Sequence, residues 1–236
     1  MGLRRRFWYA FAGVPRGPLG WVGARVIAKK PGFFRAMAAE LELQPDDVLL
    51  DVGCGAGDFL ADQASHVGHV AGLDASEIPL SLARRRLADR IAAGTAEVVK
   101  GDAAALPWAD GRFSVVTSQY FLKFLPHPEA ALREMCRVLR PGGRAVVTLS
   151  DTDQRGWGAT DRSGTADGWG QWFWSDADAQ RLMAEAGFAD VAVSVGAGAG
   201  KPQLVRGVKP VPAGIERARE TAAPAESVAP AEAAVS

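Results

Sequence analysis

Three glycines at alternate positions follow a short apolar run that contains one acid. The run extends from Val48 to Val52 and includes Asp51, and the glycines are Gly53, Gly55 and Gly57. An apolar run that stops at glycines predicts a buried parallel strand followed by a sharp turn. Because glycine lacks a Cβ atom, such a turn lets backbone N–H groups approach a bound molecule closely. We therefore expect a ligand site at this glycine loop.

The residues after the loop predict a helix from Asp58 to about His66, whose N-terminal end would favour an anionic group of the ligand. The dinucleotide fingerprint G-x-G-x-x-G also lies between a strand and a helix. Here the third glycine, Gly57, comes one position too early for that fingerprint. The spacing therefore argues against a nicotinamide-dependent oxidoreductase, which stays an alternative, as does a glycine-rich turn without a ligand.

A second acid follows the next predicted strand, residues 69–74. This strand ends in Asp74, which lies 21 residues beyond Gly53. That separation corresponds to one strand–helix–strand step, so Asp74 should face the glycine loop. A carboxylate there can accept hydrogen bonds from both hydroxyls of a ribose, and charge-assisted bonds are roughly twice as strong as neutral ones. The alternative is that Asp74 and Ser76 only cap the following helix; we favour ribose binding.

A third acid, Asp102, follows the strand predicted for residues 97–100. A carboxylate in this position can accept a hydrogen bond from the amino group of adenine, while the amide of Ala103 donates to a ring nitrogen. A turn at residues 109–111 and a fourth strand over residues 113–117 come next. The three acids and the loop together predict a site for a nucleoside-like ligand.

Helices are predicted between the strands. Residues 76–92 predict one long helix, whose four arginines we expect to face water rather than nucleic acid, since no aromatic residues are interleaved with them. Residues 126–149, PHPEAALREMCRVLRPGGRAVVTL, predict a helix with apolar side chains on one face, including Leu139. The Pro-Gly-Gly of residues 141–143 should end that helix and turn into a fifth strand.

These motifs, in this order, resemble the class I S-adenosyl-L-methionine (SAM) dependent methyltransferases. The glycine loop is similar to motif I of that family. Residues 126–149 look like the LxExxRVLxPGG segment of its small-molecule members related to the ubiquinone and menaquinone C-methyltransferases. The resemblance covers roughly residues 45–150. It implies an α/β fold with a doubly wound, Rossmann-like, seven-stranded sheet, mostly parallel with an antiparallel C-terminal strand, plus an N-terminal helical cap.

The resemblance implies SAM as the cofactor and methyl transfer to a small acceptor, which the aromatic content of the flanking segments suggests is hydrophobic. It assigns cofactor binding to residues at the ends of the first four strands: Asp51, Gly53, Cys54, Gly55, Gly57, Asp74, Ala75, Asp102, Ala103, Ser118 and Gln119. It identifies no catalytic residue. If the acceptor must lose a proton, Tyr120 and His127 are candidate bases, although His127 is better interpreted as a surface histidine. A non-catalytic SAM-binding regulatory protein would carry the same motifs.

The chain divides into three parts. Residues 1–44 form an aromatic and basic cap, residues 45–211 the methyltransferase domain, and residues 212–236 a tail rich in Ala, Pro and Glu that we expect to be disordered. A tryptophan-rich insertion at residues 151–174 is a candidate substrate lid; the alternative is a loop packed on the surface. Ser175 should cap the next helix.

Composition limits the partners and the compartment. The 27 basic and 27 acidic residues balance, so net charge argues against nucleic acid. Residues 1–39 nevertheless hold eight basic residues and no acid. We favour a lid role for residues 1–30, with peripheral membrane contact as the alternative. The two cysteines fit neither a disulfide framework nor a metal site, so we expect a reducing cytoplasm. Nothing in the sequence indicates an oligomeric state.

Overall fold

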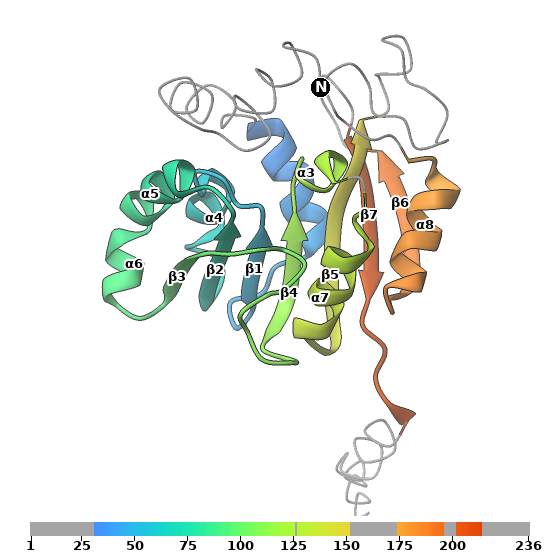
Figure 1. Cartoon of the computed structure of the whole chain (residues 1–236). Helices are drawn as coiled ribbons and strands as arrows, with labels where there is room; N and C mark the ends of the chain where they lie inside the picture. Colours follow the sequence, from blue (N-terminus) through green and yellow to red (C-terminus); the bar gives the residue numbers. More distant parts are fainter. Residues whose placement is uncertain (1–30, 126, 152–173, 196–201, 214–236) are drawn as a thin grey trace, which may run out of the picture.

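The computed structural model describes residues 31–125, 127–151, 174–195 and 202–213 (Figure 1). The predictions for residues 1–30, for most of the tryptophan-rich insertion and for most of the tail lie outside these residues. In the described part of the chain, no helix is both long and apolar enough to cross a membrane.

A seven-stranded sheet with the order β3-β2-β1-β4-β5-β7-β6 forms the centre of the molecule (Figure 1). The strands are β1 (Val48–Val52), β2 (His69–Asp74), β3 (Ala96–Lys100), β4 (Phe113–Ser118), β5 (Leu139–Asp151), β6 (Ala189–Val195) and β7 (Pro202–Val208). The first five strands pair in parallel, and β7 is antiparallel to both of its neighbours. The order reverses beside β1, which confirms the predicted doubly wound sheet with an antiparallel C-terminal strand.

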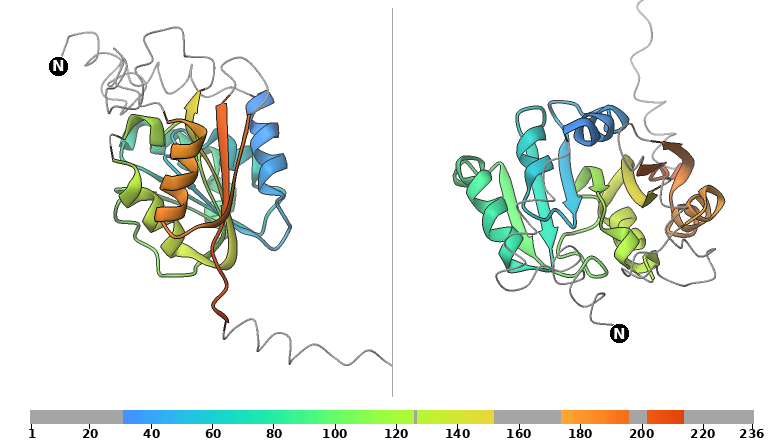
Figure 2. Two further views of the ribbon diagram at one scale, coloured as in Figure 1. Left: turned by 90° about the vertical axis from the view of Figure 1, so that its right-hand side faces the viewer. Right: turned by 90° about the horizontal axis from the view of Figure 1, so that it is seen from above.

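Helices cover both faces of the sheet (Figure 2). They are α3 (Pro31–Leu41), α4 (Asp58–Gln63), α5 (Glu77–Arg86), α6 (Ala88–Ala92), the 3-10 helix η2 (Leu122–Phe124), α7 (Glu129–Val138) and α8 (Asp176–Glu185). Alternate strand residues supply two separate cores. Leu49 packs in the core that includes Met37 of α3, and Leu50 in the core that includes Met135 of α7. This alternation follows from the two-residue period of a strand.

Two helices are shorter than the sequence predicts. The helix predicted for residues 58–66 ends at Gln63. The helix predicted for residues 76–92 is divided at the buried residue Leu87, whose φ of −101° and ψ of 12° interrupt it. Arg90, expected to face water, instead donates to the backbone oxygens of Val67 and Gly68. Arg90 of α6 therefore binds the loop between α4 and β2.

The boundary between α7 and β5 also differs from the prediction. Leu139 has the extended ψ of 140° and begins β5, so residues 141–143 lie inside the strand rather than at the end of the helix. Gly142 has a φ of 75°, a conformation that favours glycine. The predicted cap of α8 is confirmed, because the hydroxyl of Ser175 accepts a hydrogen bond of 3.2 Å from the amide of Asp178.

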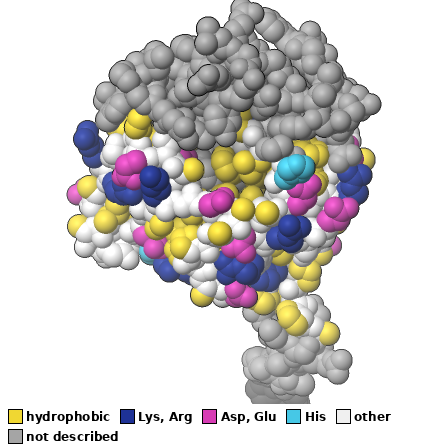
Figure 3. Space-filling model, in the orientation of Figure 1, with side chains coloured by type: hydrophobic (Ala, Val, Ile, Leu, Met, Phe, Trp, Pro, Cys, Tyr) yellow, Lys and Arg dark blue, Asp and Glu magenta, His cyan; other side chains and the backbone are white. Residues whose placement is uncertain are grey.

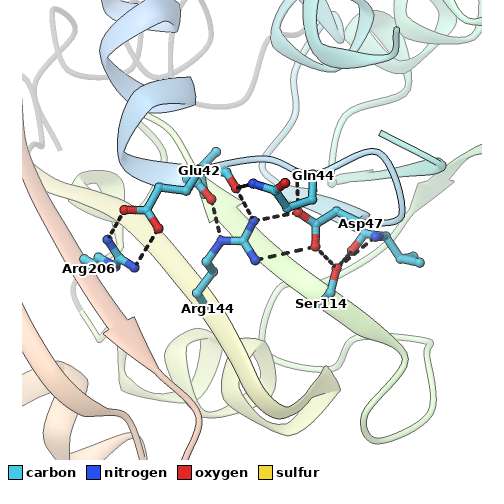
Figure 4. A network of polar contacts seen from close by, with 8 residues as sticks. Glu42, Gln44, Asp47, Ser114, Arg144 and Arg206 are labelled. Atoms are coloured by element: carbon cyan, nitrogen blue, oxygen red, sulfur yellow. Dashed lines mark hydrogen bonds and ion pairs between the residues drawn. The ribbon is translucent and has the colours of Figure 1, made fainter. Parts of the chain in front are cut away.

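A polar network fixes the amino ends of the central strands (Figure 4). Asp47, just before β1, accepts hydrogen bonds from Ser114 of β4 at 2.6 Å and Arg144 of β5 at 2.6 Å. Burial alone would raise the pKa of Asp47, but the bonds from Arg144, Ser114 and the Gln44 amide hold it below its ordinary value. Arg144 also donates to the backbone oxygen of Glu42, and so joins the end of α3 to the sheet.

Candidate functional site

The ends of β1 and β2 bring the glycine loop and Asp74 together. Asp51 of β1 lies opposite Gly72 of β2, so Asp74 stands slightly beyond the end of β1. The amide of Gly55 donates to Oδ2 of Asp74 at 3.0 Å, and the amide of Ser76 donates to Oδ1 at 2.8 Å. Asp74 therefore faces the loop, as its spacing predicts, and also contacts the start of the next helix, as the capping alternative predicts.

The loop conformation requires glycine. Gly53, Gly55 and Gly57 have φ angles of 77°, 53° and 70°. A Cβ atom on Gly53 would lie 2.5 Å from the Cγ atom of Phe121, whereas one on Gly55 would have no atom of the described residues within 4 Å. Gly55 is thus the point at which a ligand can approach the bare backbone, and Gly53 is the point at which the protein's own aromatic ring does so.

Four amides of the loop already donate within the protein. Those of Gly53 and Cys54 donate to the backbone oxygen of Leu73 at 2.7 and 3.0 Å, and that of Gly57 donates to the oxygen of Cys54 at 2.9 Å. The Gly55 amide binds Asp74. Binding of an anionic ligand group by these amides stays a prediction, and the shortened helix α4, which begins with the acid Asp58, adds little to it.

Asp51 is a buried acid with an unpaired carboxyl oxygen in the described structure. Asp51 is 3% exposed, and its Oδ1 atom has no hydrogen-bond partner in the part of the chain that the structure describes. Burial, with a further contribution from the charge of Asp74, raises the pKa of Asp51 to about 8. Asp74 is partly buried, which raises its pKa, but the amides of Ser76, Gly55 and Ala75 oppose that effect. A buried carboxyl oxygen of this kind is costly unless something pairs with it.

The end of β4 contributes two more polar groups without partners. The Oγ atom of Ser118 and the Nε2 atom of Gln119 are both buried and lack a hydrogen-bond partner. β4 is hydrogen-bonded to β1, and Asp51 lies opposite Thr117, so these groups follow immediately beyond Asp51 along the sheet. The ends of β1 and β4 therefore carry three buried polar atoms that have no hydrogen-bond partner among the described residues, on Asp51, Ser118 and Gln119.

The other predicted binding residues occupy the same edge without showing a binding contact. Asp102 is exposed, and its Oδ1 accepts the amide of Ala104 at 2.9 Å. Ala103 is buried and Ala75 is exposed. Cys54 is buried, which raises the pKa of its thiol. The roles of these residues stay predictions.

Beyond β4 the chain places Tyr120, which the sequence analysis names as a candidate base, beside Lys123, which it does not name. Lys123 is only 7% exposed, and its Nζ atom lies 4.9 Å from the ring centroid of Tyr120. The amide of Tyr120 donates to Thr148 at 2.6 Å, and its φ is 54°. His127 is exposed, which agrees with the interpretation as a surface histidine. A lysine within an apolar helical turn gives no sequence signal of its own.

Comparison with known proteins gives a family match for the central part of the chain. Residues 50–147 match the family described as a methyltransferase domain. The chain is 41% identical over 108 residues to the ubiquinone/menaquinone biosynthesis C-methyltransferase UbiE of Ectopseudomonas mendocina, a match that covers 44% of this chain and 42% of that protein. It is 43% identical over 101 residues to the demethylmenaquinone methyltransferase of Lactococcus lactis, with 42% and 40% covered. The match thus spans less than half of these relatives.

Solved structures support the fold of the methyltransferase domain. A SAM-dependent methyltransferase from Aquifex aeolicus matches with a TM-score of 0.62 at 18% identity, covering 80% of this chain and 97% of that one. The YcgJ protein from Bacillus subtilis matches with a TM-score of 0.61 at 17% identity, covering 78% and 100%. The [4+2]-cyclase SpnF matches equally well, with a TM-score of 0.61 at 19% identity and 84% of each chain covered. At these identities the likeness shows the fold and not the reaction.

The segment that resembles the C-methyltransferases, residues 126–149, contains two residues with a structural role. Arg137 of α7 donates to the backbone oxygens of Leu106 at 3.0 Å and Trp108 at 2.8 Å, and binds Asp110 at 2.7 Å. Glu134 accepts the amide of Leu106 at 2.8 Å. The pair Glu134 and Arg137 therefore holds the loop between β3 and β4 against α7.

Proposed function

We propose that this protein transfers the methyl group of SAM to a small, hydrophobic acceptor. The observation that carries the proposal is the buried carboxyl of Asp51, whose Oδ1 has no partner and which lies beside Asp74 at the glycine loop. Two adjacent buried acids favour a cation, because a positive charge offsets both the desolvation of the carboxylates and their mutual repulsion.

The charges of the site fit SAM better than a dinucleotide. SAM carries a sulfonium cation and an ammonium group, which match an acidic floor made by Asp51 and Asp74. A dinucleotide would instead bring a pyrophosphate toward these acids, and like charges in a low-dielectric site repel strongly. The loop supports the same choice, since its third glycine comes too early for the dinucleotide fingerprint.

Different residues of the site would then bind different parts of the cofactor. Asp51, with Ser118 and Gln119, would hold the methionine portion; Asp74 would accept from the ribose; and Asp102 with the amide of Ala103 would bind adenine. SAM supplies an electrophilic methyl group on a leaving group that becomes neutral. The protein's main task is therefore alignment, and holding reactants in line can supply on the order of 7–11 kcal/mol.

The acceptor is proposed to be hydrophobic because aromatic side chains adjoin the loop. Phe121 packs against Gly53, and Tyr120 and Phe124 both lie near the ammonium of Lys123. Hydrophobic side chains also gather in the upper part of the face shown in Figure 3. The curated relatives are named as methyltransferases of quinone biosynthesis, which makes quinols and phenols the first acceptors to test.

Calorimetric titration tests the cofactor. We expect SAM and its demethylated product to bind and NAD to give no signal. Replacing Asp74 by Asn should weaken SAM roughly tenfold to a hundredfold, since hydrogen bonds to charged groups contribute about 1.5–3 kcal/mol. The exposed Asp89 of α6 provides a matched control, and Asp89→Asn should bind SAM normally. Binding of NAD without SAM would overturn the proposal in favour of an oxidoreductase.

Methyl transfer itself requires a separate measurement. SAM with a labelled methyl group should be incubated with quinols, phenols, fatty acids and lipid headgroups, and the extracted products counted. We expect transfer to a quinol or phenol. Tyr120→Phe and His127→Gln then test for a base, because loss of a needed base lowers the rate by about 10²–10⁴. SAM binding without transfer to any member of the panel would favour a non-catalytic SAM-binding protein.

A further inference from the structure

The acids at the glycine loop differ in how they are supported. Asp74 accepts hydrogen bonds from the amides of Gly55 and Ser76 at 3.0 and 2.8 Å. The amides nearest to Asp51 in the chain, those of Gly53 and Cys54, donate instead to Leu73. The charged form of Asp74 thus has two amide donors, whereas nothing in the described structure stabilises a charge on the Oδ1 side of Asp51.

The charge of Asp74 acts on Asp51, and of two interacting acids the one with less support keeps the proton. The proton therefore belongs on Asp51. Burial first, and the charge of Asp74 second, raise the pKa of Asp51 to about 8. Near neutral pH the site without a ligand then contains one carboxylate and one carboxylic acid.

Among the described residues, the elements around Asp51 provide no cation that stabilises its charge. β2 contributes Asp74, and the loop contributes the Cys54 thiol, whose pKa burial and both acids raise; Arg84 of α5 acts on that thiol in the opposite direction. β4 contributes only uncharged groups at this point. The titratable groups that follow β4, Tyr120 and Lys123, contact each other.

We propose that Asp51 exchanges its proton for the positive charge of the methyl donor, so that this acid distinguishes SAM from the demethylated product. This inference rests on the proposed function and deepens it. When SAM binds, the O–H bond of Asp51 breaks, the electron pair stays on oxygen and the proton goes to solvent. When the methyl group leaves, the sulfur keeps the electron pair of the broken S–C bond and becomes neutral, and Asp51 takes a proton back.

The exchange gives SAM and product different pH dependences. Below the pKa of Asp51, binding of SAM requires release of one proton, so its dissociation constant should fall about tenfold for each pH unit from 6 to 7.5 and level off above 8. The product keeps the ammonium group but lacks the sulfonium charge. Its dissociation constant should change much less over the same range, so the preference for SAM over product should grow with pH.

The test is calorimetric titration of the full chain with SAM and with the product at several pH values between 6 and 8.5. At each pH, two buffers of different ionisation enthalpy give the number of protons released. We expect release of nearly one proton for SAM at pH 6.5 and clearly fewer for the product. Asp51→Asn, which has the same shape, should bind SAM with no pH dependence in this range, whereas Asp89→Asn should behave as the unchanged protein.

Three results separate the inference from the proposed function. Absence of SAM binding at every pH would refute the proposed function. SAM binding that is independent of pH would refute the proton exchange alone. Equal proton release for SAM and product would also overturn the inference, because it would show that Asp51 responds to the ammonium group that both molecules share. Thermal unfolding of Asp51→Asn establishes that the variant is folded.

Discussion

Replacement of Gly53 by alanine tests the contact between the glycine loop and the aromatic segment after β4. The substitution has two costs. A residue with a Cβ atom at a φ of 77° loses roughly 1–2 kcal/mol relative to glycine. The new Cβ would also lie 2.5 Å from Cγ and 2.6 Å from Cβ of Phe121. Because these atoms are close to the Phe121 backbone, the ring cannot simply swing away, and such overpacking costs about 1–3 kcal/mol.

Gly55→Ala is a matched control for the first cost. Its φ is 53°, but a Cβ atom there meets nothing within 4 Å. The free energy of unfolding should therefore fall by about 1–2 kcal/mol in Gly55→Ala and by about 2–5 kcal/mol in Gly53→Ala. Urea unfolding followed by circular dichroism gives both values, provided that the slope with denaturant is unchanged.

A double variant isolates the second cost. Removing the whole side chain, Cβ included, with Phe121→Gly should relieve the clash, so Gly53→Ala should cost about 1–3 kcal/mol less in that background than in the unchanged protein. Strictly additive losses would refute the contact between Gly53 and Phe121. Equal losses in Gly53→Ala and Gly55→Ala would contradict it as well.

Three further predictions concern stability. The fold raises the pKa of Asp51 to about 8, so the protonated acid stabilises the folded state. This stabilisation is fully present below about pH 3.9 and is lost as pH rises through 8. The free energy of unfolding should fall by up to about 5 kcal/mol over that range. Thermal melts of the protein without ligand should therefore show stability falling toward pH 8.5, and Asp51→Asn should remove the fall; equal pH profiles would contradict this. Arg137→Met should lower the free energy of unfolding by about 2–4 kcal/mol, because Glu134 and two backbone oxygens lose their partner. The control Arg133→Met, at an exposed residue, should change it by less than about 0.5 kcal/mol. Equal effects of the two variants in urea unfolding would refute the role of Arg137. Ser175→Ala removes the cap of α8 and should cost about 1 kcal/mol in the same assay; no loss would show that the cap contributes nothing.

The sequence predicts the sheet well because its signals are local and strong. The apolar run before Gly53 and the spacing to Asp74 fix two neighbouring strands and the loop between them, and both are confirmed. The antiparallel C-terminal strand is also confirmed. These features depend on periodicity and on the right-handed strand–helix–strand step, which constrain the chain without knowledge of its side-chain contacts.

Helix boundaries are predicted less well because tertiary contacts decide them. The break at Leu87 lets Arg90 reach the oxygens of Val67 and Gly68, residues far from it in sequence. Nothing in residues 76–92 announces that contact. Leu139 fits the apolar pattern of a helix and of a strand equally, and pairing with Phe113 of β4 places it in the strand.

The candidate site likewise combines features that the sequence predicts with features that only tertiary contacts decide. The types and order of Asp51, Asp74 and Asp102 predict which strand ends carry acids. The sequence could not show that Asp51 lacks a hydrogen-bond partner at Oδ1 while Asp74 has two amide donors, because this depends on where each loop amide points. Burial of Lys123 beside Tyr120 is a further result of packing that no residue pattern reveals.

The antiparallel strand β7 has a consequence for how this protein can diverge. Asp151, at the end of β5, pairs with Pro202, and Val195, at the end of β6, pairs with Gln203. Residues 152–173 and 196–201 are therefore joined to the sheet at the edge that carries the glycine loop, and at pairs whose register the sheet already sets. Lengthening, shortening or exchanging either segment leaves the ladder of backbone bonds intact. Either segment can thus change in length or sequence during evolution without a change in the strand pairs at which it begins or ends.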